Sequence, residues 1–394
     1  MKSRLSLLLL LIVSSLSLAV PAFAQDRNTT AECVTTYDAN TDYFPDKVTV
    51  EAAAGFSVEY HNNYKVVTVN TPWQGAEAPL TYVLVQCGTP APEMESTATI
   101  EVPVNTVVSM STSFLPHLTA QGLLDKVVAV DSMLYTNNEV LQARFAADAV
   151  VEVGGGGGGT EVNIEKLIDL QPGLILTQRF SADDTTYPTI QEAGLPVVID
   201  ADFLDVSPLG LAEWGKFISL FFNTEALAQE QFAGVQARYE ELATLAKTAD
   251  SLPTVFAGTP FDSTWFMPGG ASYLGTLIRD AGGNYLWGDD ESTGSLFLDM
   301  ETVLDTAADA DYWVNIFQTS KSEVLGLDER LRQFAAFENN AYTNNARMNA
   351  NGGSDYFENG YANPDVLLAD LVKIFHPNLL PDHELVYYAK LAAG

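Results

Sequence analysis

Two blocks of short apolar runs that alternate with helical patterns constrain the fold more than any other feature of this chain. The first block contains the runs Val127–Val130 and Leu174–Thr177, and the second begins with Thr254–Ala257. Between the blocks, residues 225–247 keep apolar residues at helical spacing without a strand signal. Short apolar strands that alternate with helices indicate a parallel sheet covered on both faces. We therefore predict an α/β fold of two lobes with mainly parallel sheets, joined by a long rigid helix.

A small β-rich segment precedes the first lobe. Phe56, Val58 and Tyr60 alternate with polar residues, and Tyr82–Val85 predicts a further strand. Gly88–Thr99, which contains two prolines, is interpreted as a linker. The predicted organisation is a signal peptide (1–24), a β-rich N-terminal segment and linker (25–100), an N-terminal α/β lobe (101–206), interlobe helices (207–250) and a C-terminal α/β lobe (251–394).

The first residues have the pattern of a secretory signal peptide. Lys2 and Arg4 precede the apolar run Leu5–Val20, and Ala22–Ala24 has the small residues of a cleavage site. The run is short for a membrane-spanning helix, and no cysteine follows it where a lipid anchor would need one. We expect a periplasmic protein, exported and cleaved after Ala24.

Cys33 and Cys87 are the two cysteines of the chain. An oxidising compartment favours a disulfide between them. A metal site would need more ligands than two, and no histidine lies within a few residues of either cysteine. We therefore predict the disulfide.

The chain is strongly acidic, with 51 acidic and 19 basic residues and a formal net charge of −32. Such a charge repels nucleic acid and anionic lipid at long range, so we expect neither as a partner. Adaptation to a saline habitat would produce the same composition. An acidic protein is nevertheless well suited to docking on a basic surface of a partner protein.

Six consecutive glycines, Gly154–Gly159, follow an apolar triplet and precede a predicted helix. A phosphate-binding loop needs a Lys-Ser/Thr pair directly after its glycines, but Thr160 and Glu161 follow here. Loops at strand ends of open α/β sheets commonly contact ligands. Two interpretations stay open: a flexible surface loop, and a cleft loop in which missing side chains give clearance for a bulky ligand.

Four stretches, taken in order, resemble a known family. They are VVSMSTSFLPHLTAQGLLDKVVAVDS (107–132), VNIEKLIDLQPGLILT (162–177), FMPGGASYLGTLIRDAGGNYLW (266–287) and DMETVLDTAADADYWV (299–314). This order is similar to that of the class III substrate-binding proteins of ABC importers, which capture ferric siderophores, haem or cobalamin. The resemblance covers roughly residues 104–391, and Gly173 stands where the family usually has Asp. The β-rich segment lies outside the family pattern.

The resemblance implies a binding protein and not an enzyme, with no cofactor of its own. It implies capture of a metal chelate between the lobes, a ferric siderophore before haem or cobalamin, by a monomer that delivers it to an ABC permease and its ATPase. In the family, one surface glutamate on each lobe docks against permease arginines. The matching positions here are Glu165 and Glu301.

The resemblance also implies that loops at the strand ends of both lobes line the cleft. Bulky planar ligands need aromatic walls, and an anionic chelate needs an arginine, for which Arg179 is the preferred position. The predicted ligand-binding residues are Phe114, His117, Tyr135, Arg179, Trp265 and Arg347, with Phe180, Phe266, Tyr285 and Trp287 as further aromatic positions. For each aromatic residue, ordinary core packing is the alternative.

Three other functions are alternatives for this sequence. Binding of bare zinc or manganese needs several converging His and carboxylate ligands, and only His117 of the four histidines lies at a predicted cleft loop. A secreted hydrolase would need a nucleophile on a sharp turn such as G-x-S-x-G, which the sequence lacks. A sensor lobe of a signalling receptor would use the same fold. We predict neither metal ligands nor catalytic residues.

Overall fold

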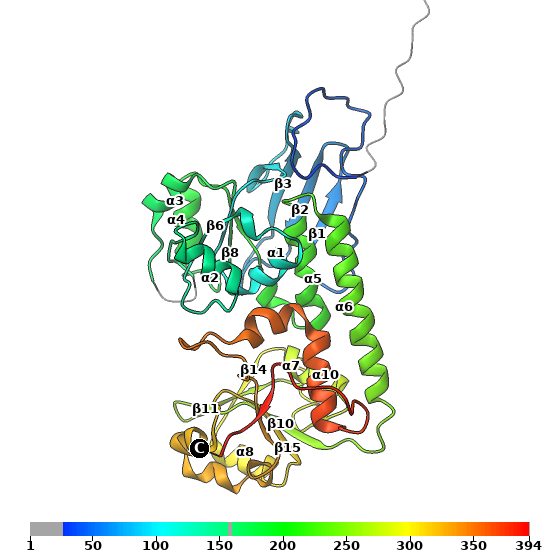
Figure 1. Ribbon diagram of the computed structural model, residues 1–394, viewed down its shortest axis with the longest axis vertical. Helices are drawn as coiled ribbons and strands as arrows, with labels where there is room; N and C mark the ends of the chain where they lie inside the picture. Colours follow the sequence, from blue (N-terminus) through cyan, green and yellow to red (C-terminus); the bar gives the residue numbers. More distant parts are fainter. Residues whose placement is uncertain (1–26, 157–159, 394) are drawn as a thin grey trace, which may run out of the picture.

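The computed structural model describes residues 27–156 and 160–393. The predicted signal peptide, with its cleavage site after Ala24, and Gly157–Gly159 of the glycine run lie outside these residues. Two α/β lobes lie one above the other, and α6 (Glu225–Ala246) extends along both (Figure 1). The predicted fold class is confirmed. None of the described helices is long and apolar enough to cross a bilayer.

The N-terminal lobe is built on a sheet in which all paired strands are parallel. Its order is β7 (Val151–Glu152), β6 (Val127–Val130), β5 (Val107–Ser109), β8 (Leu174–Thr177) and β9 (Val197–Ile199). The central strands are buried along their length, as expected when helices cover both faces. Those helices are α1 (Leu115–Ala120), α2 (Glu139–Ala146), α3 (Ile164–Leu170) and α4 (Thr186–Glu192).

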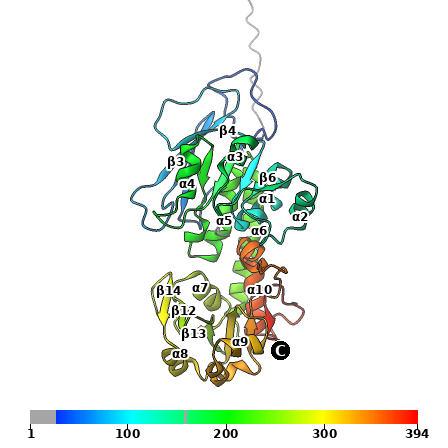
Figure 2. The same ribbon diagram turned by 90° about the vertical axis from the view of Figure 1, so that its left-hand side faces the viewer.

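The C-terminal lobe contains a mixed sheet and a smaller antiparallel one. The mixed sheet has the order β13 (Asn284–Tyr285), β10 (Thr254–Ala257), β15 (Tyr312–Ile316), β16 (Ala341–Thr343) and β17 (Ala389–Lys390), and only β17 is antiparallel to its neighbour. The antiparallel sheet is formed by β11 (Pro260–Phe261), β12 (Thr264–Pro268) and β14 (Ser295–Leu298). The helices α7 (Tyr273–Asp280), α8 (Met300–Ala307), α9 (Lys321–Leu327) and α10 (Pro364–Phe375) surround these sheets (Figure 2).

The part of the chain after β15 consists mostly of short elements and turns. Among the described residues after β15, only α10 is longer than seven residues. The stretch before it, residues 349–363, is rich in asparagine and glycine, which favour turns over helix.

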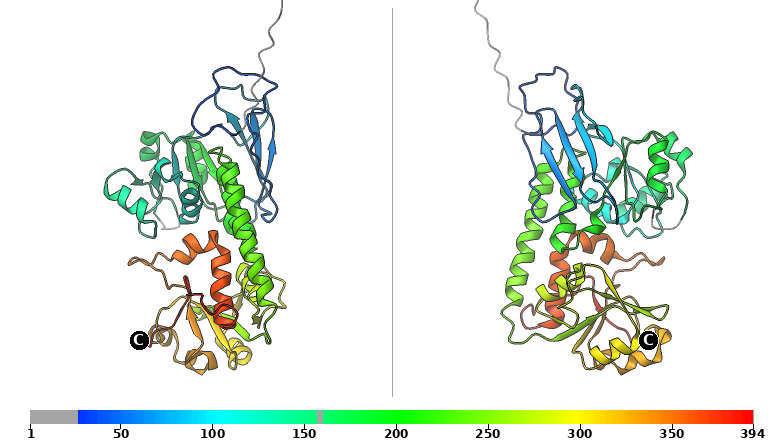
Figure 3. Two further views of the ribbon diagram at one scale, coloured as in Figure 1. Left: turned by 45° about the vertical axis from the view of Figure 1, so that its right-hand side comes forward. Right: turned by 180° about the vertical axis from the view of Figure 1, so that it is seen from behind.

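The helices α5 (Pro208–Ser219) and α6 occupy the region between the two lobes, and α6 joins the lobes. α5 packs in the N-terminal lobe, and α6 leads from it to the C-terminal lobe, where it packs against α10 (Figure 3). Asn223, with a φ of +58°, forms the turn between α5 and α6. With 22 residues, α6 is about 33 Å long, since an α-helix rises about 1.5 Å per residue.

The N-terminal segment forms a four-stranded sheet of β1 (Phe56–Tyr60), β2 (Tyr64–Val69), β3 (Leu80–Gln86) and β4 (Ala98–Val102). The predicted linker is too long, because its last residues already belong to β4, which pairs in parallel with β3. The predicted disulfide between Cys33 and Cys87 is confirmed. The sheet shares one continuous core with the N-terminal lobe: the ring of Phe56 lies 4.9 Å from that of Trp214 on α5.

A fully buried ion pair lies where the N-terminal segment meets the interlobe helices. Nζ of Lys65 on β2 lies 2.5 Å from Oε1 of Glu225, the first residue of α6, and neither side chain is exposed. Lys65 also donates to the carbonyl oxygen of Leu220 and to Oδ1 of Asn223. One ammonium group therefore binds the end of α5, the turn and the start of α6.

A second buried ion pair joins the same segment to α5. Nζ of Lys216 lies 2.6 Å from Oε1 of Glu213, again with neither side chain exposed. The Glu213 carboxylate also accepts hydrogen bonds from the backbone N–H groups of residues 51–53. The loop before β1 is thereby held on α5.

On another side of the molecule, the loop after β6 binds the C-terminal lobe. The backbone N–H of Asn137 donates to Oε2 of Glu358 at 2.6 Å. Nδ2 of Asn349 donates to the carbonyl oxygens of Leu134 and Thr136. Burial raises the pKa of the Glu358 carboxyl from 4.5 to about 7, so this contact between the lobes includes a group that titrates near neutrality.

Replacing Lys65 with Met leaves the Glu225 carboxylate buried without its cation. We expect the free energy of unfolding to fall by about 3–5 kcal/mol, because an unpaired buried charge is strongly destabilising. The double variant Lys65→Met/Glu225→Met should lose much less of its free energy of unfolding, because it leaves no unpaired buried charge. Urea denaturation followed by circular dichroism measures both. Lys47→Met removes the exposed ion pair with Asp42 and serves as the control. If Lys65→Met is as stable as this control, the buried pair does not stabilise the fold as we expect.

Replacing Glu358 with Gln keeps an oxygen acceptor for Asn137 but removes the ionisation. Since the folded-state pKa of about 7 lies above the ordinary 4.5, the folded protein binds more protons between these values, and this group contributes less stability as pH rises through them. We therefore expect the melting temperature of Glu358→Gln to rise relative to the wild type from about pH 5 to about pH 8. Thermal denaturation at both values checks this, and a pH-independent difference would show that Glu358 does not titrate there.

Candidate functional site

A cavity of about 360 Å³ lies between the lobes. In the C-terminal lobe it is bordered by Gly258, Phe317 and Asn344, which directly follow β10, β15 and β16. The N-terminal lobe contributes residues 203, 205 and 206, which follow β9. Ligands of open α/β sheets bind at such carboxyl ends, and the volume lies within the range of small-molecule sites. This interlobe cavity is the candidate binding site.

Aromatic side chains form a substantial part of the wall of the interlobe cavity. They are Phe203, Tyr273, Phe317, Tyr356, Phe357 and Tyr361. Several pack on one another: the ring of Tyr356 lies 5.1 Å from that of Phe357 and 5.6 Å from that of Tyr361. Phe317 and Phe357 keep 52% and 41% of their surface exposed, so their rings are available to a ligand. Rigid aromatic walls suit a bulky ligand because they bury area at low entropic cost.

A hydrogen-bond network holds the wall in place. Nδ2 of Asn315 donates to the hydroxyl of Tyr356 at 3.1 Å, and the hydroxyl of Tyr388 donates to Oδ1 of Asn315 at 2.6 Å. Asn315 has a φ of +53°, and the register of β15 against β16 shifts around it. Such a left-handed position suits Asn better than most residues, and it interrupts the ladder where the strand reaches the cavity.

Two buried polar atoms of the wall lack partners. Within the described part of the chain, neither the hydroxyl of Tyr273 nor Oδ1 of Asn344 has a hydrogen-bond partner. Burial raises the pKa of Tyr273, so its hydroxyl stays a donor. Leaving such a group unsatisfied costs about 1–3 kcal/mol, and native proteins rarely do so without a reason. A ligand that accepts from Tyr273 and donates to Asn344 would satisfy both.

Asp205 is the one charged side chain among the described residues that line the interlobe cavity. Its Oδ2 accepts from Nε1 of Trp214 at 2.9 Å, and its carboxylate faces the backbone N–H groups of Ala54 and Gly55. Burial is the main cause that raises the pKa of Asp205. The N-terminal segment and α5 therefore fix the position of this carboxylate at the cavity.

Two of the predicted ligand-binding aromatic residues are core residues instead. Trp265 is fully buried, its Nε1 donates to the carbonyl of Ala257 at 2.9 Å, and its ring packs 6.0 Å from that of Trp313. Strand alternation explains the error, because β12 turns Trp265 inward and Phe266 outward. Phe114 is likewise buried, in the core of the N-terminal lobe.

The further aromatic positions divide in the same way. Tyr285 is buried, and its hydroxyl donates to the carbonyl of Pro268, whereas Trp287 packs partly buried against the C-terminal core. Phe180 is half exposed, and its ring lies 4.9 Å from that of Phe203 in the cavity wall. Phe180 therefore adjoins the interlobe cavity through Phe203.

The two predicted arginines do not line the interlobe cavity. The guanidinium of Arg179 lies 4.1 Å from the ring centre of Trp73 in the N-terminal segment and donates to the carbonyls of Ser181 and Ala182. Sequence position alone could not reveal this stacking partner, which lies more than a hundred residues away. Arg347 is half exposed and pairs with Asp355 at 2.6 Å.

Tyr135 lies on the loop after β6 that binds the C-terminal lobe. It keeps 40% of its surface exposed, and its carbonyl oxygen approaches Gly353, where a Cβ atom would overlap it. Tyr135 is thus near the boundary between the lobes, outside the lining of the interlobe cavity.

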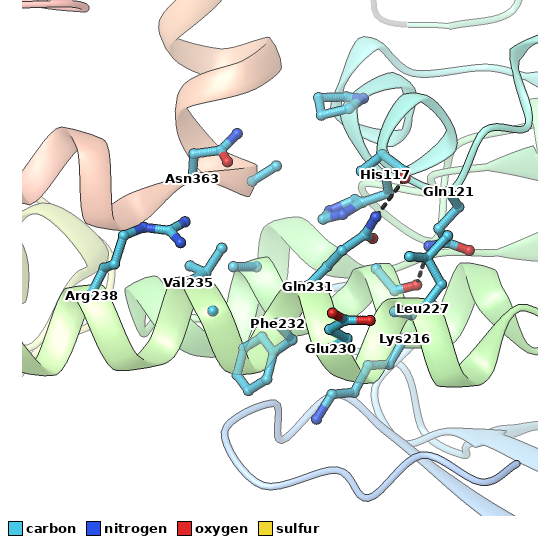
Figure 4. A pocket seen from close by; sticks show the side chains of 17 residues that line it. His117, Gln121, Lys216, Leu227, Glu230, Gln231, Phe232, Val235, Arg238 and Asn363 are labelled. Carbon is cyan, nitrogen blue, oxygen red and sulfur yellow. Dashed lines mark hydrogen bonds between the residues drawn. The ribbon is translucent and has the colours of Figure 1, made fainter.

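His117 lines a different cavity. This second cavity, of about 450 Å³, lies along α6 between α1, α5 and residues 362–363 of the C-terminal lobe (Figure 4). The imidazole is 9% exposed, burial lowers its pKa to about 4, and a Cβ on Gly215 would overlap the ring. His117 is therefore a neutral side chain beside the interlobe helices, away from the strand ends where we predicted it.

The two predicted docking glutamates are both exposed. Glu165 lies in the first turn of α3 and Glu301 in the first turn of α8, one on each lobe. Asn163 and Asp299 cap these helices by accepting from backbone N–H groups of the first turn. The caps fix the helix starts, and the glutamate side chains remain free of the ion pairs found among the described residues.

The described part of the glycine run forms a third hollow at the strand ends. Gly155 and Gly156 line it with Met110, Gln178 and Phe180. Gly155 has a φ of +81°, and a Cβ on Gly156 would overlap the carboxylate of Asp131, so both positions require glycine for conformation or space. Close backbone approach is thus one reason for glycines at this strand end.

Sequence reasoning missed the main wall of the site. Tyr356, Phe357 and Tyr361 form an aromatic cluster inside an asparagine- and glycine-rich stretch, which was a usable signal for a ligand wall. No comparable signal separates Asn344 from the adjacent Asn345. In residues 27–156 and 160–393, no group of three or more His, Cys, Asp or Glu side chains is arranged to hold a metal ion.

Comparisons with known proteins agree with this architecture. A family model described as periplasmic binding protein matches residues 107–342. An uncharacterized lipoprotein from Methanocaldococcus jannaschii is 25% identical over 300 residues, which are 74% of this chain and 70% of that protein.

Two similar solved structures show the same fold. A possible iron-binding (periplasmic solute-binding) protein from Staphylococcus epidermidis has 15% identity and a TM-score of 0.53, over 70% of this chain and 99% of that one. A periplasmic binding protein from Veillonella parvula has 16% identity and a TM-score of 0.54, over 79% and 98%. These two likenesses show the fold alone, whereas the periplasmic family model and the lipoprotein relative support an exported protein. Because the family model covers more than half of the sequence, the chain belongs to the periplasmic binding protein family.

Proposed function

We propose that the chain is the substrate-binding subunit of an ABC importer. It captures a metal chelate, a ferric siderophore before haem or cobalamin, in the interlobe cavity and delivers it to a membrane permease. The observation that carries this proposal is the aromatic wall at the strand ends, which includes two buried polar atoms without partners. Family membership and the similar structure of a possible iron-binding protein support the same ligand class.

The chemistry of the wall favours a chelated metal over a bare one. Bare zinc or manganese is held by imidazole, thiolate or carboxylate ligands. The groups that face the interlobe cavity are phenyl and phenol rings, amides and hydroxyls, with one carboxylate that other groups already engage. Such surfaces recognise the organic shell of a complex. Tyr135, exposed near the lobe boundary, remains a proposed contact for the part of a chelate that extends beyond the cavity.

Delivery is proposed to depend on Glu165 and Glu301. A carboxylate on each lobe gives a permease two contact points, and an arginine fork binds a carboxylate in a defined orientation. Because one contact belongs to each lobe, the pair reports the relative position of the lobes. Both side chains are exposed and project from capped helix starts, as such contacts require.

Removing the exposed rings of the wall should weaken binding without unfolding the protein. Phe317→Ala and Phe357→Ala should each reduce affinity for a bound chelate by about 3- to 10-fold, since each loses one aromatic contact. Fluorescence titration with a panel of ferric siderophores, haem and cobalamin measures this. Phe145→Ala on α2, at 38% exposure, is the matched control. If the wild-type protein binds none of these chelates, the proposed function is refuted.

Charge reversal of the docking glutamates should separate delivery from binding. Glu165→Lys/Glu301→Lys should abolish chelate uptake by cells, because two lysines would face the permease arginines, while chelate affinity of the purified protein stays within about twofold. Glu139→Lys/Glu241→Lys changes two exposed helix glutamates and should leave uptake intact. If the first double variant loses affinity, or if both double variants lose uptake equally, the docking role is wrong.

A further inference from the structure

We infer that the chelate selected by this protein carries no net negative charge, and that Tyr273 and Asn344 are the side chains that position it. This inference rests on the proposed function and narrows it. It is argued from the charges that surround the interlobe cavity and from the two polar atoms that its wall leaves unpaired.

The charges close to the interlobe cavity are negative. Asp205 belongs to the wall itself. Asp202, on the same strand-end turn, is 3% exposed and acts electrostatically on Tyr361, which also lines the cavity. Asp200, two residues earlier, is fully buried, and burial raises the pKa of its carboxyl well above the ordinary value, so Asp200 adds no charge here. The cavity thus adjoins a carboxylate-rich turn, in a chain of net charge −32.

The cations of this region are engaged elsewhere. No basic residue is among the described residues that line the interlobe cavity. Arg179 is held between the ring of Trp73 and two backbone carbonyls. Arg347 pairs with Asp355, and Lys216 pairs with Glu213 beside the second cavity. An anion entering the interlobe cavity would therefore meet carboxylates without a compensating cation, and burial strengthens that repulsion.

The charge of a ferric complex follows from its chelating groups. Three hydroxamates, each with one negative charge, neutralise Fe³⁺, and an added ammonium group makes the complex cationic. Three catecholates carry two negative charges each, so their complex with Fe³⁺ has a net charge of −3. Haem carries two negatively charged propionates. The interlobe cavity therefore fits a trihydroxamate or similar uncharged or cationic complex, and it disfavours catecholates and haem.

Both unpaired atoms are buried in the wall, and we assign them the direct contacts once a side-chain rotation exposes them to the ligand. The hydroxyl of Tyr273 donates, and Oδ1 of Asn344 accepts. Amides beside the chelating groups of a neutral complex offer both a carbonyl and an N–H. The charged oxygens of an anionic complex only accept hydrogen bonds, so they would leave Oδ1 of Asn344 unpaired. A site built to hydrogen-bond both ways rejects a ligand that lacks one partner.

The test is fluorescence titration of the mature protein, near physiological ionic strength, with three ferric complexes. These are an uncharged trihydroxamate, a trihydroxamate bearing an ammonium group, and a tris-catecholate. We expect the first two to bind at least about 100-fold more tightly than the third. Equal or tighter binding of the tris-catecholate would overturn the inference while leaving the proposed function intact. Failure of all three, together with haem and cobalamin, would refute the proposed function and the inference with it.

Variants separate the contributing side chains. Tyr273→Phe and Asn344→Ala should each weaken binding of the uncharged complex about 10-fold, with melting temperatures close to the wild type. Arg179→Ala and Arg347→Ala should leave that affinity unchanged; a 10-fold loss in either would show that the ligand is held by an arginine. Ser295→Arg adds a cation to the wall. The ratio of the affinity for the uncharged complex to that for the tris-catecholate should therefore fall at least about fivefold. A merely structural role of these positions would not change the ratio between complexes.

Discussion

The buried contact between Lys65 and Glu225 lies where three parts of the molecule meet. Withdrawing charges from water is costly, so such a pair persists only when its remaining hydrogen-bonding groups are satisfied. Here the three ammonium donors of Lys65 all have acceptors, at the end of α5, on the turn and at the start of α6. The direction in which α6 leaves the N-terminal lobe is thereby tied to the β-rich segment, which the family pattern does not include.

The geometry of the site follows from that direction. Arg238 on α6 pairs with the buried Asp365 in the first turn of α10, and the short π-helix before α10 (Tyr356–Gly360) carries Tyr356 and Phe357. The part of the aromatic wall in the C-terminal lobe therefore lies opposite Phe203 and Asp205 at a spacing that α6 sets. The contact between Asn137 and Glu358 fixes the lobes on another side. A binding protein constrained in this way closes by small displacements, which suits a ligand already matched by a preformed wall.

Sequence periodicity was sufficient for the elements but not for the site. β6, β8 and β10 coincide with the predicted apolar runs, because buried parallel strands require such runs whatever surrounds them. The orientation of Trp265 instead depends on the pairing of β12 with β11 and β14, and the fate of Arg179 depends on a distant ring. The glutamates of α3 and α8, whose docking role is proposed, were chosen from family resemblance, and the structure shows only that they are exposed near capped helix starts. Contacts between remote segments leave no periodic trace.

The two hydrophobic cores divide the chain without interleaving. One is drawn from residues 44–222 and the other from residues 239–391. A polypeptide translocated with its amino end first thus releases everything needed for the first core before the second begins to emerge. In a chain that emerges in this order, the β-rich segment, its disulfide and the start of α6 would be available before the second core. The later half would then assemble against a template of fixed shape.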